Sequence, residues 1–386
     1  MTLRASYDPH NEELQLFRQT VRKFIAEKIM PFYAEWERDH LTPRALWNSF
    51  GEAGLLGVDL PEQAGGAGAP FPFSTIIPEE IARAGAAALA TNVSIHSDIV
   101  MPYILHLGTD EQKQQWLPKM LTGEVVGAIA MTEPNAGSDL ASIRTTAKDE
   151  GDGFCINGSK IFITNGQHAD LVIVAAKTDQ QKGAKGISLF LVDASLPGYS
   201  RGRKLDKMGQ HAGDTSELFF DNLRVPKSAL LGKAGEGFAQ LMNELPRERL
   251  IIAIMGLGAA DGALEWTIDY VQQRKAFGKS ISDFQNTRFK LAEMKTAIEL
   301  NRAFINQCID QYMQGTLNTS TASMAKLAAT ELQGRVTDEC VQLFGGYGYM
   351  NEYPICRAYV DARVQRIYGG SSEIMKEIIA RSLVGR

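Results

Sequence analysis

A block of short β-rich segments between residues 125 and 232, with helical sequence on both sides, restricts the fold more than any other feature. Segments such as VVGAIAMT, GFCINGSKIFIT and GISLFLVD alternate with turn residues, and the pairs Asn157-Gly158 and Asn165-Gly166 are typical of hairpin turns. No helical segment separates these strands, which excludes a Rossmann dinucleotide-binding unit. We therefore predict an α+β fold in which an antiparallel sheet or barrel lies between two helical domains.

The segments before and after this block have the periodicity of amphipathic helices. In the first third, Pro31 and Thr42-Pro43 are expected to interrupt helices, and Thr109 is expected to cap another. Two further helices are expected at about 74–87 and 92–107. Apolar residues recur on one helical face near the N-terminus and again in the last third: Leu14, Phe17, Val21, Phe24 and Ile25, then Leu291, Met294, Ile298, Ile305 and Cys308. The expected domains are residues 1–126, 127–234 and 235–386.

Composition and charge are those of an ordinary globular protein. Of 386 residues, 44% are hydrophobic and 22% are charged, and a net charge of −5 without a lysine or arginine run argues against a nucleic-acid partner. No apolar stretch is expected to be long enough to span a bilayer. The N-terminus lacks the apolar core of a signal peptide, so we expect a cytoplasmic protein or a mature form without a presequence. The long C-terminal helices are expected to need partner subunits to cover their apolar faces.

The cysteines and histidines lack metal-binding spacing along the chain. The four cysteines lie far apart without a CxxC pair, and the six histidines include neither HExxH nor a pair at i,i+4. We therefore expect reduced, mostly buried thiols, no disulfide and no metal.

Two glycine-containing segments resemble phosphate loops only superficially. Residues 61–70 lack the GxxxxGK[ST] pattern and are expected to form a surface loop. Gly278-Lys279-Ser280 could end such a pattern, but Gln273 stands where its first glycine is required. Neither segment is expected to bind a nucleotide phosphate in that way.

Two other segments combine turn residues with a possible ligand site. Residues 130–139, AMTEPNAGSD, end a strand, and taken alone they form a loop capped by Ser138 and Asp139. In residues 342–374 an otherwise helical pattern is interrupted and then stopped by glycines, which taken alone indicates two helix C-caps joined by a tight connection. These glycines are Gly345, Gly346, Gly348, Gly369 and Gly370.

Both segments resemble signatures of the acyl-CoA dehydrogenase family, and the resemblance extends from the first helix to Ala380-Arg381. It is closest to the long-chain branch, which EYPICRAYVDARVQRIYGGSSEIMKEIIAR matches almost residue for residue. The resemblance implies an N-terminal helical domain, a middle antiparallel β domain and a C-terminal four-helix bundle. It also implies FAD as cofactor and a homotetramer, built as a dimer of dimers, whose neighbouring subunits share flavin sites.

The resemblance assigns one group of flavin contacts to the β block. Met131 and Thr132 would meet the isoalloxazine ring, and Thr164 would reach its N5 atom. Ser138 would contact the flavin phosphate or the coenzyme portion of the substrate. Phe162 stands where many members have a tryptophan near the ring, although an aromatic residue on an alternating strand is more often part of the core.

A second group of contacts comes from the helical C-terminal third. Members of this group would reach the flavin of an adjacent subunit: Arg274, Phe277, Gln285, Gln342, Gly345 and Gly346. The guanidinium of Arg274 suits pyrophosphate oxygens, and its alternative role is to stabilise the C-terminus of a helix. Ser371, where threonine is common, keeps the hydroxyl expected to contact flavin, and Glu373 is assigned to the same site.

The catalytic base is expected at an unusual position. In the family the residue after Tyr368 usually supplies a glutamate, and here that residue is Gly369. Removal of a proton next to a thioester carbonyl needs a carboxylate in a water-poor pocket, where its pKa rises. The long-chain and isovaleryl-type branches carry this base at the position of Glu248, which we expect at the start of a hydrophobic helix near Pro246. Glu244, one turn earlier, is the second candidate.

Two further assignments concern Glu248 and the substrate. A solvated Glu248 paired with Arg247 or Arg249 is the alternative without a catalytic role. The N–H of Gly369 would polarise the thioester carbonyl, and residues 92–98 are expected near the floor of the acyl pocket. The expected substrate contacts are Ser138, Glu244, Leu245, Arg249, Tyr368, Gly369 and Gly370.

The predicted reaction is the α,β-dehydrogenation of a saturated long-chain or branched acyl-CoA to the trans-2-enoyl-CoA. The flavin would take the β-hydrogen as hydride and pass electrons to an electron-transfer flavoprotein. Two alternatives stay open. One is a flavin oxidase or monooxygenase on the same scaffold. The other is a flavin-bound assembly protein that is catalytically inactive because it lacks an acid at position 369.

Overall fold

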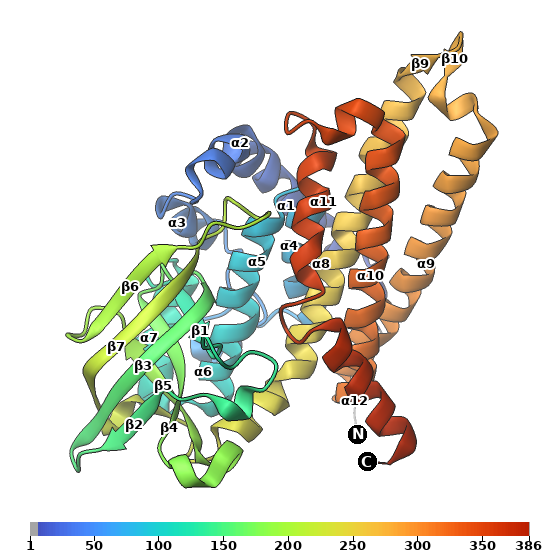
Figure 1. The fold of residues 1–386 in the computed structure, drawn as a ribbon. Helices are drawn as coiled ribbons and strands as arrows, with labels where there is room; N and C mark the ends of the chain where they lie inside the picture. Colours follow the sequence, from blue (N-terminus) through green and yellow to red (C-terminus); the bar gives the residue numbers. More distant parts are fainter. Residues whose placement is uncertain (1–6, 386) are drawn as a thin grey trace.

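The computed structural model describes residues 7–385 and contains, in chain order, a helical region, a β sheet and a bundle of long helices (Figure 1). Residues 1–6, part of the segment on which the expected localisation rests, lie outside the described residues. The helices before the sheet are α1 (Glu12–Phe24), α2 (Met30–Asp39), α3 (Ala45–Glu52), α4 (Phe71–Arg83), α5 (Ala87–Ser94), α6 (Met101–Leu107) and α7 (Asp110–Leu121).

The ends of these helices follow from capping residues, with two departures from expectation. Thr109 caps α7 as predicted, in a capping box with Gln112. Pro31 does not end a helix, because a π-helical turn (Ile25–Ile29) joins α1 to α2 and places the proline in the first turn of α2, where no N–H is needed. The helix expected at 92–107 begins earlier, since α5, a π-helical segment (Ile95–Val100) and α6 follow one another without a break.

The middle region is one mixed sheet whose strands run in the order β6-β7-β3-β2-β4-β5-β8, with β1 also paired to β4. The strands are β1 (Gly127–Ala130), β2 (Thr146–Asp149), β3 (Gly153–Thr164), β4 (Leu171–Lys177), β5 (Ile187–Asp193), β6 (Tyr199–Lys204), β7 (Thr215–Pro226) and β8 (Leu230–Leu231). Because β4 pairs in parallel with both β1 and β2, the prediction of a purely antiparallel sheet is wrong for these pairs.

Neither Asn-Gly pair forms the hairpin that was predicted. Asn157-Gly158 lies inside β3 at a shift in its register with β7, and a Cβ on Gly158 would lie 2.5 Å from Oγ1 of Thr145. The pair therefore marks a β-bulge. Asn165-Gly166 forms a turn after β3, but the next strand, β4, does not pair with β3. The Asn165 amide donates instead to the carbonyl of Asn92, at 2.9 Å, and so fastens the sheet to α5.

After the sheet the chain forms a helical bundle, in agreement with the expected architecture. Its elements are α8 (Gly237–Gln273), the two-stranded β9 (Lys275–Ala276) and β10 (Lys279–Ser280), α9 (Gln285–Met313), α10 (Thr319–Phe344), α11 (Pro354–Gln365) and α12 (Ser372–Val384). The predicted apolar face of α9 is buried at Met294, Ile298, Ile305 and Cys308. Figure 1 shows α8 and α10 side by side in the bundle, with β9 and β10 projecting at its far end.

Helix α8 corrects the expectation about apolar length. Its most apolar 18-residue window has a mean hydropathy of 1.4. It is the one helix among residues 7–385 that is long and apolar enough to cross a membrane. However, 78% of that window is buried inside the protein, because α8 packs against α4, α9 and α10. Its apolar length is that of a core helix.

Candidate active site

Glu248 lies inside α8 and is buried. The helix begins at Gly237, so the expectation that it starts near Pro246 is wrong, and Pro246 is accommodated within it. The Glu248 side chain is 4% exposed, and its Oε1 accepts a hydrogen bond of 2.9 Å from the hydroxyl of Tyr103 on α6. Glu248 is therefore not the solvated residue of the alternative interpretation.

The surroundings of Glu248 place its titration near neutral pH. Burial raises the pKa of the Glu248 carboxyl to about 7, and the nearby charge of Glu244 also raises it. The hydrogen bond from Tyr103 and the charge of Arg249 lower the pKa and only partly offset the burial. A carboxylate with this pKa can accept a proton and release it again at physiological pH.

The charged neighbours of Glu248 along the helix are engaged elsewhere. The carboxylate of Glu244, the second candidate base, is hydrogen-bonded to Nδ1 of His106 at 2.9 Å. Arg247 turns to the opposite side, where it pairs with Asp59 at 2.8 Å and with Asp98 at 3.4 Å. Of the two candidate acids, Glu248 is the more deeply buried, and it accepts a hydrogen bond from the hydroxyl of Tyr103.

The glycine turn after α11 packs against the same stretch of α8. Gly369 has a φ of 62°, and a Cβ at this position would lie 2.3 Å from Cδ1 of Ile252, one turn beyond Glu248. The place that usually holds the family's glutamate is therefore filled by Ile252. Next to it, the guanidinium of Arg249 lies 3.8 Å from the position of a Cβ on Gly370. The structure thus brings the predicted residues of α8 and of this turn together.

The remaining predicted substrate and turn residues lie around this contact. Tyr368 is half-buried, with its hydroxyl 3.5 Å from Oγ1 of Thr91, and Leu245 is half-buried on α8. Ser371 caps α12, because its hydroxyl accepts a 3.4 Å hydrogen bond from the N–H of Ile374, and Glu373 is exposed in the first turn.

The predicted flavin contacts of the β region gather where β1 ends beside β3. Met131 and Thr132 are half-buried. The carbonyl of Met131 accepts a hydrogen bond of 2.9 Å from Nζ of Lys160, and the carbonyl of Thr132 accepts one of 2.9 Å from the N–H of Ile161. Lys160 also forms a buried ion pair of 2.8 Å with Glu133. This pair fixes the loop after β1 onto β3.

Phe162 points away from the core at this same place. It is 63% exposed and has a φ of 61°, at a shift in the register between β3 and β7. The general expectation that such an aromatic residue is buried is wrong here, because the bulge turns its side chain outward. Thr164 is half-buried further along β3. Ser138 is exposed in a loop, and a Cβ built on the preceding Gly137 would have no atom within 4 Å.

The second predicted group lies at the other end of the bundle. Arg274 ends α8 and lies 5.4 Å from the ring centre of Tyr347, and Phe277, at the tip between β9 and β10, is 94% exposed. An open hollow of about 690 Å³ is lined by Arg274, Gln342, Gly345 and Gly346, among others. Gln285 is exposed at the start of α9. Figure 1 shows β9 and β10 far from strands β1 and β3, so one chain does not bring the two groups together.

Each group offers part of what a flavin dinucleotide requires: open space and a cation at the end of the bundle, and an exposed aromatic ring in the β region. Ideal Cβ atoms on Gly345 and Gly346 would meet nothing within 4 Å, which leaves space for a ligand against the backbone. Arg274 offers a guanidinium for phosphate oxygens. Phe162 offers an exposed aromatic face for a ring system.

Several residues important to this site gave no signal in the sequence. Tyr103 is separated from Glu248 by 145 positions, and Ile252 reaches Gly369 only through packing. The buried pair of Lys160 and Glu133 could have been suspected only from a lysine in the middle of an otherwise apolar strand.

The three-region fold, with a helical region, a β sheet and a helical bundle in chain order, places the protein among the flavin-dependent dehydrogenases. Models of the N-terminal, middle and C-terminal domains of acyl-CoA dehydrogenases match residues 11–124, 128–223 and 235–384. The chain belongs to the acyl-CoA dehydrogenase family: it is an enzyme that dehydrogenates acyl-CoA with FAD as cofactor.

Individual relatives cover almost the whole chain. The long-chain specific acyl-CoA dehydrogenase of Rattus norvegicus mitochondria is 50% identical over 376 residues, which are 97% of this chain and 87% of the relative. A crystal structure of acyl-CoA dehydrogenase from Geobacillus kaustophilus superposes with a TM-score of 0.94 at 49% identity, covering 96% of this chain and 98% of that one. A glutaryl-CoA dehydrogenase from Mycobacterium smegmatis in complex with FADH2 has a TM-score of 0.92 at 32% identity, covering 97% of this chain and 95% of that one.

Proposed function

We propose that this enzyme converts a saturated long-chain or branched acyl-CoA into the trans-2-enoyl-CoA, with Glu248 as the catalytic base. The burial of the Glu248 carboxylate, 4% exposed and hydrogen-bonded to Tyr103, carries this proposal. The contact between Gly369 and Ile252 supports it, because an acid at position 369 would need the space that Ile252 fills. The 50% identity to a long-chain specific relative favours a long acyl chain.

In the proposed mechanism, Glu248 accepts the proton from the carbon next to the thioester carbonyl. Tyr103 holds the carboxylate in place and stabilises its charged form. The N–H of Gly369 donates to the thioester oxygen and so stabilises the negative charge that develops there. Bound FAD supplies the acceptor for the hydride that leaves the β carbon.

The substrate and cofactor would be held by the residues already described. Tyr368, Leu245, Arg249 and Gly370 would line the site next to Glu248. The acyl chain would run toward residues 92–98, which are buried except at Ile95. Ser138 would contact the coenzyme portion or the flavin phosphate from its exposed loop.

Two subunits would complete each flavin site in this proposal. Met131, Thr132, Phe162 and Thr164 would contact the flavin ring from one chain. The hollow at the end of the neighbouring chain's bundle, with Arg274, Phe277, Gln285, Gln342, Gly345 and Gly346, would hold the remainder. A dimer of such dimers would give a homotetramer, and electrons would pass to an electron-transfer flavoprotein. The distance between the two groups within one chain supports this arrangement.

Replacement of the base tests the mechanism. Glu248→Gln removes the proton acceptor but keeps the shape of the side chain, so we expect turnover to fall by about 10²–10⁴-fold with the FAD content unchanged. Steady-state rates with an artificial electron acceptor and the flavin absorbance of the purified protein measure the two quantities. Glu244→Gln is the matched variant. A larger loss of turnover in Glu244→Gln than in Glu248→Gln would assign the base to Glu244 instead.

A second experiment separates this function from its alternatives. Anaerobic addition of straight and methyl-branched acyl-CoAs of increasing length should bleach the flavin absorbance, with the fastest bleaching for the preferred substrate. A protein that only binds flavin would show no bleaching. Rapid reoxidation by oxygen with the substrate still bound would indicate an oxidase.

A further inference from the structure

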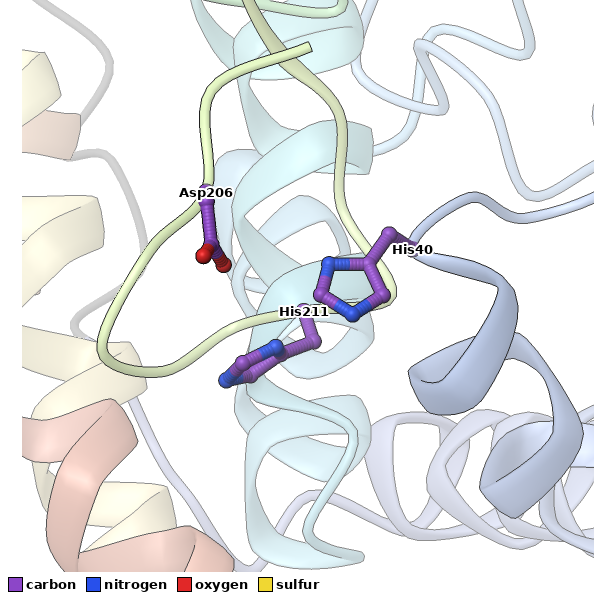
Figure 2. Close-up of side chains that lie close together, drawn as sticks. All are labelled: His40, Asp206 and His211. Atoms are coloured by element: carbon purple, nitrogen blue, oxygen red, sulfur yellow. The ribbon is translucent and has the colours of Figure 1, made fainter.

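Two histidines and an aspartate from distant parts of the chain converge outside the active site. His40 follows helix α2, and Asp206 and His211 lie in the loop between β6 and β7 (Figure 2). Figure 2 shows their side chains pointing toward one another across the space between the helix end and the loop. Each offers one ligand atom, and these atoms all lie within 4.8 Å of one another. This cluster could not be found from residue spacing, because the fold brings His40 together with two residues that lie far from it along the chain.

The backbone on both sides of the cluster is firmly held. His40 has a left-handed φ of 56°, and its N–H donates to the carbonyl of Trp36 as the cap of α2. In the loop, the N–H of Ala212 donates to Oε1 of Glu37 at 2.9 Å, and the N–H of Gln210 donates to the carboxylate of Asp361. The two imidazoles are therefore presented from anchored positions.

The His211 ring has the backbone support that a metal-binding histidine often has. Nε2 of His211 lies 3.3 Å from the carbonyl of Met208, which accepts its proton and leaves the lone pair on Nδ1. A backbone carbonyl that receives the second ring N–H is the usual support of a histidine ligand. The His40 and His211 rings meet edge to face, with centres 4.8 Å apart.

No protein cation occupies this position among residues 7–385. Asp206 forms no salt bridge among residues 7–385, and the ammonium groups of the two neighbouring lysines donate to backbone carbonyls. Lys204 donates to the carbonyl of Asp39 at 3.1 Å, and Lys207 donates to the carbonyl of Gly213 at 2.5 Å. The Asp206 carboxylate therefore faces two imidazoles without a direct salt-bridge partner among residues 7–385, although the Lys207 ammonium attracts it from a greater distance.

We propose that His40, Asp206 and His211 bind one divalent transition-metal ion of the zinc class. Two imidazole nitrogens and one carboxylate oxygen form a ligand set that suits Zn²⁺ better than Mg²⁺ or Ca²⁺, which take mainly oxygen ligands. Zinc ligands lie at about 2.0–2.2 Å from the metal, so the three atoms must close by roughly 1 Å on binding. Asp206 is exposed and free to make this movement. Water would fill the fourth position.

The ion would add a direct link between two parts of the fold that the hydrogen bonds of Ala212 with Glu37 and of Lys204 with Asp39 already connect. It would fix the end of α2, in the N-terminal helical region, to the β6–β7 loop of the sheet. Gln210, next to His211, is buried, and its Oε1 lies 3.4 Å from Oγ1 of Thr91, whose hydroxyl is also 3.5 Å from that of Tyr368. The metal would therefore stabilise a loop that reaches the wall of the active site.

The test uses the tag-free, FAD-bound enzyme after treatment with a chelator. Zn²⁺ is titrated by calorimetry, and Co²⁺ is used as a spectroscopic probe of tetrahedral coordination. Asp206→Asn and His40→Asn remove ligands with little change in shape, and asparagine tolerates the left-handed φ at position 40. His10→Gln, which alters an exposed histidine outside the cluster, is the control.

We expect one Zn²⁺ per chain with a Kd below about 10 µM, at least tenfold weaker binding in both ligand variants, and unchanged binding in His10→Gln. Zn²⁺ should also raise the melting temperature of the wild-type holoenzyme and not that of the variants. A Kd for Zn²⁺ above about 10 µM in the wild type would overturn the proposal, as would equal Zn²⁺ affinity in the wild type and both ligand variants.

Discussion

The carboxylate of Glu248 is controlled by one hydroxyl group from another helix. Tyr103 donates to its Oε1 at 2.9 Å, and this hydrogen bond lowers a pKa that burial raises to about 7. Because the base acts only when ionised, kcat/KM should decline as the pH falls below about 7. Tyr103 should therefore set the lower limit of the active pH range.

Tyr103→Phe tests this role of the hydroxyl. Loss of the hydrogen bond removes a stabilising contact from the charged form, so the acidic limb of the kcat/KM profile should move to higher pH. The control is Tyr199→Phe in the β sheet. It also removes a buried tyrosine hydroxyl, but one without a hydrogen-bond partner among residues 7–385. An unchanged acidic limb in Tyr103→Phe would show that the hydroxyl does not control the base.

Gly369 is required both by its backbone conformation and by its neighbour. An alanine at a φ of 62° costs about 1–2 kcal/mol, and its Cβ would also lie 2.3 Å from Cδ1 of Ile252. Gly315→Ala provides the matched control, because Gly315 has a φ of 73° and no atom within 4 Å of a Cβ. We expect Gly369→Ala to lower the melting temperature of the holoenzyme more than Gly315→Ala does.

The double variant isolates the contact with Ile252. Ile252→Val removes the Cδ1 methyl, so adding it to Gly369→Ala should recover part of the lost melting temperature while the backbone cost remains. Equal losses in Gly369→Ala and Gly315→Ala, with no recovery in the double variant, would contradict the packing argument.

The sequence predicts Glu248 and Gly369 as the reacting residues, but not the residues that pack around them. The absence of an acid at position 369 and the acid at 248 could both be read from a resemblance to known signatures. Tyr103 and Ile252 could not, because their roles arise when α6, α8 and the turn after α11 pack together. Such contacts between distant elements have no fixed spacing along a chain.

At the scale of elements, periodicity predicted helices and strands better than turn residues predicted their pairing. The strand segments and the helical thirds were located correctly, since burial on one face leaves a regular pattern. The Asn-Gly pairs were misread because the same residues also suit a β-bulge, as in β3, or a turn between strands that do not pair. Pairing partners depend on the whole sheet, whereas turn propensity is local.

The ion pair between Lys160 and Glu133 joins two elements that the flavin site requires. Burial lowers the pKa of the Lys160 ammonium to about 8, against the opposing effect of Glu133, and the two side chains are almost fully buried. Lys160→Met leaves the carboxylate buried without its partner, which costs about 3–5 kcal/mol in comparable pairs. We expect a lower melting temperature and weaker FAD retention, because the loop at Met131 loses its support on β3.

The combined variant distinguishes the buried charge from the lost packing. Lys160→Met with Glu133→Gln removes both charges, so it should melt at a higher temperature than Lys160→Met alone. The same melting temperature in both would mean that packing, and not the unpaired charge, causes the loss.

At the scale of the whole molecule, the predicted flavin contacts divide between two ends of one chain. The β1–β3 region and the hollow at the end of the bundle cannot serve the same cofactor within a single chain (Figure 1). The sequence could suggest both groups, but only the fold shows how far apart they lie. The exposure of Phe277, at 94%, is also difficult to explain for an isolated chain.

Mixed assemblies test whether two subunits share each flavin site. Arg274→Ala should reduce FAD binding, and Glu248→Gln should abolish turnover, so each variant alone should be nearly inactive. In a mixed dimer, the site that takes its base from the Arg274→Ala chain takes its arginine from the Glu248→Gln chain and is intact. Random co-assembly of equal amounts should therefore restore about a quarter of the wild-type sites.

FAD content and turnover of the co-expressed, doubly tagged assemblies measure this recovery. If each site belonged to a single chain, every site would carry one defect, and the mixture would stay as inactive as its parents.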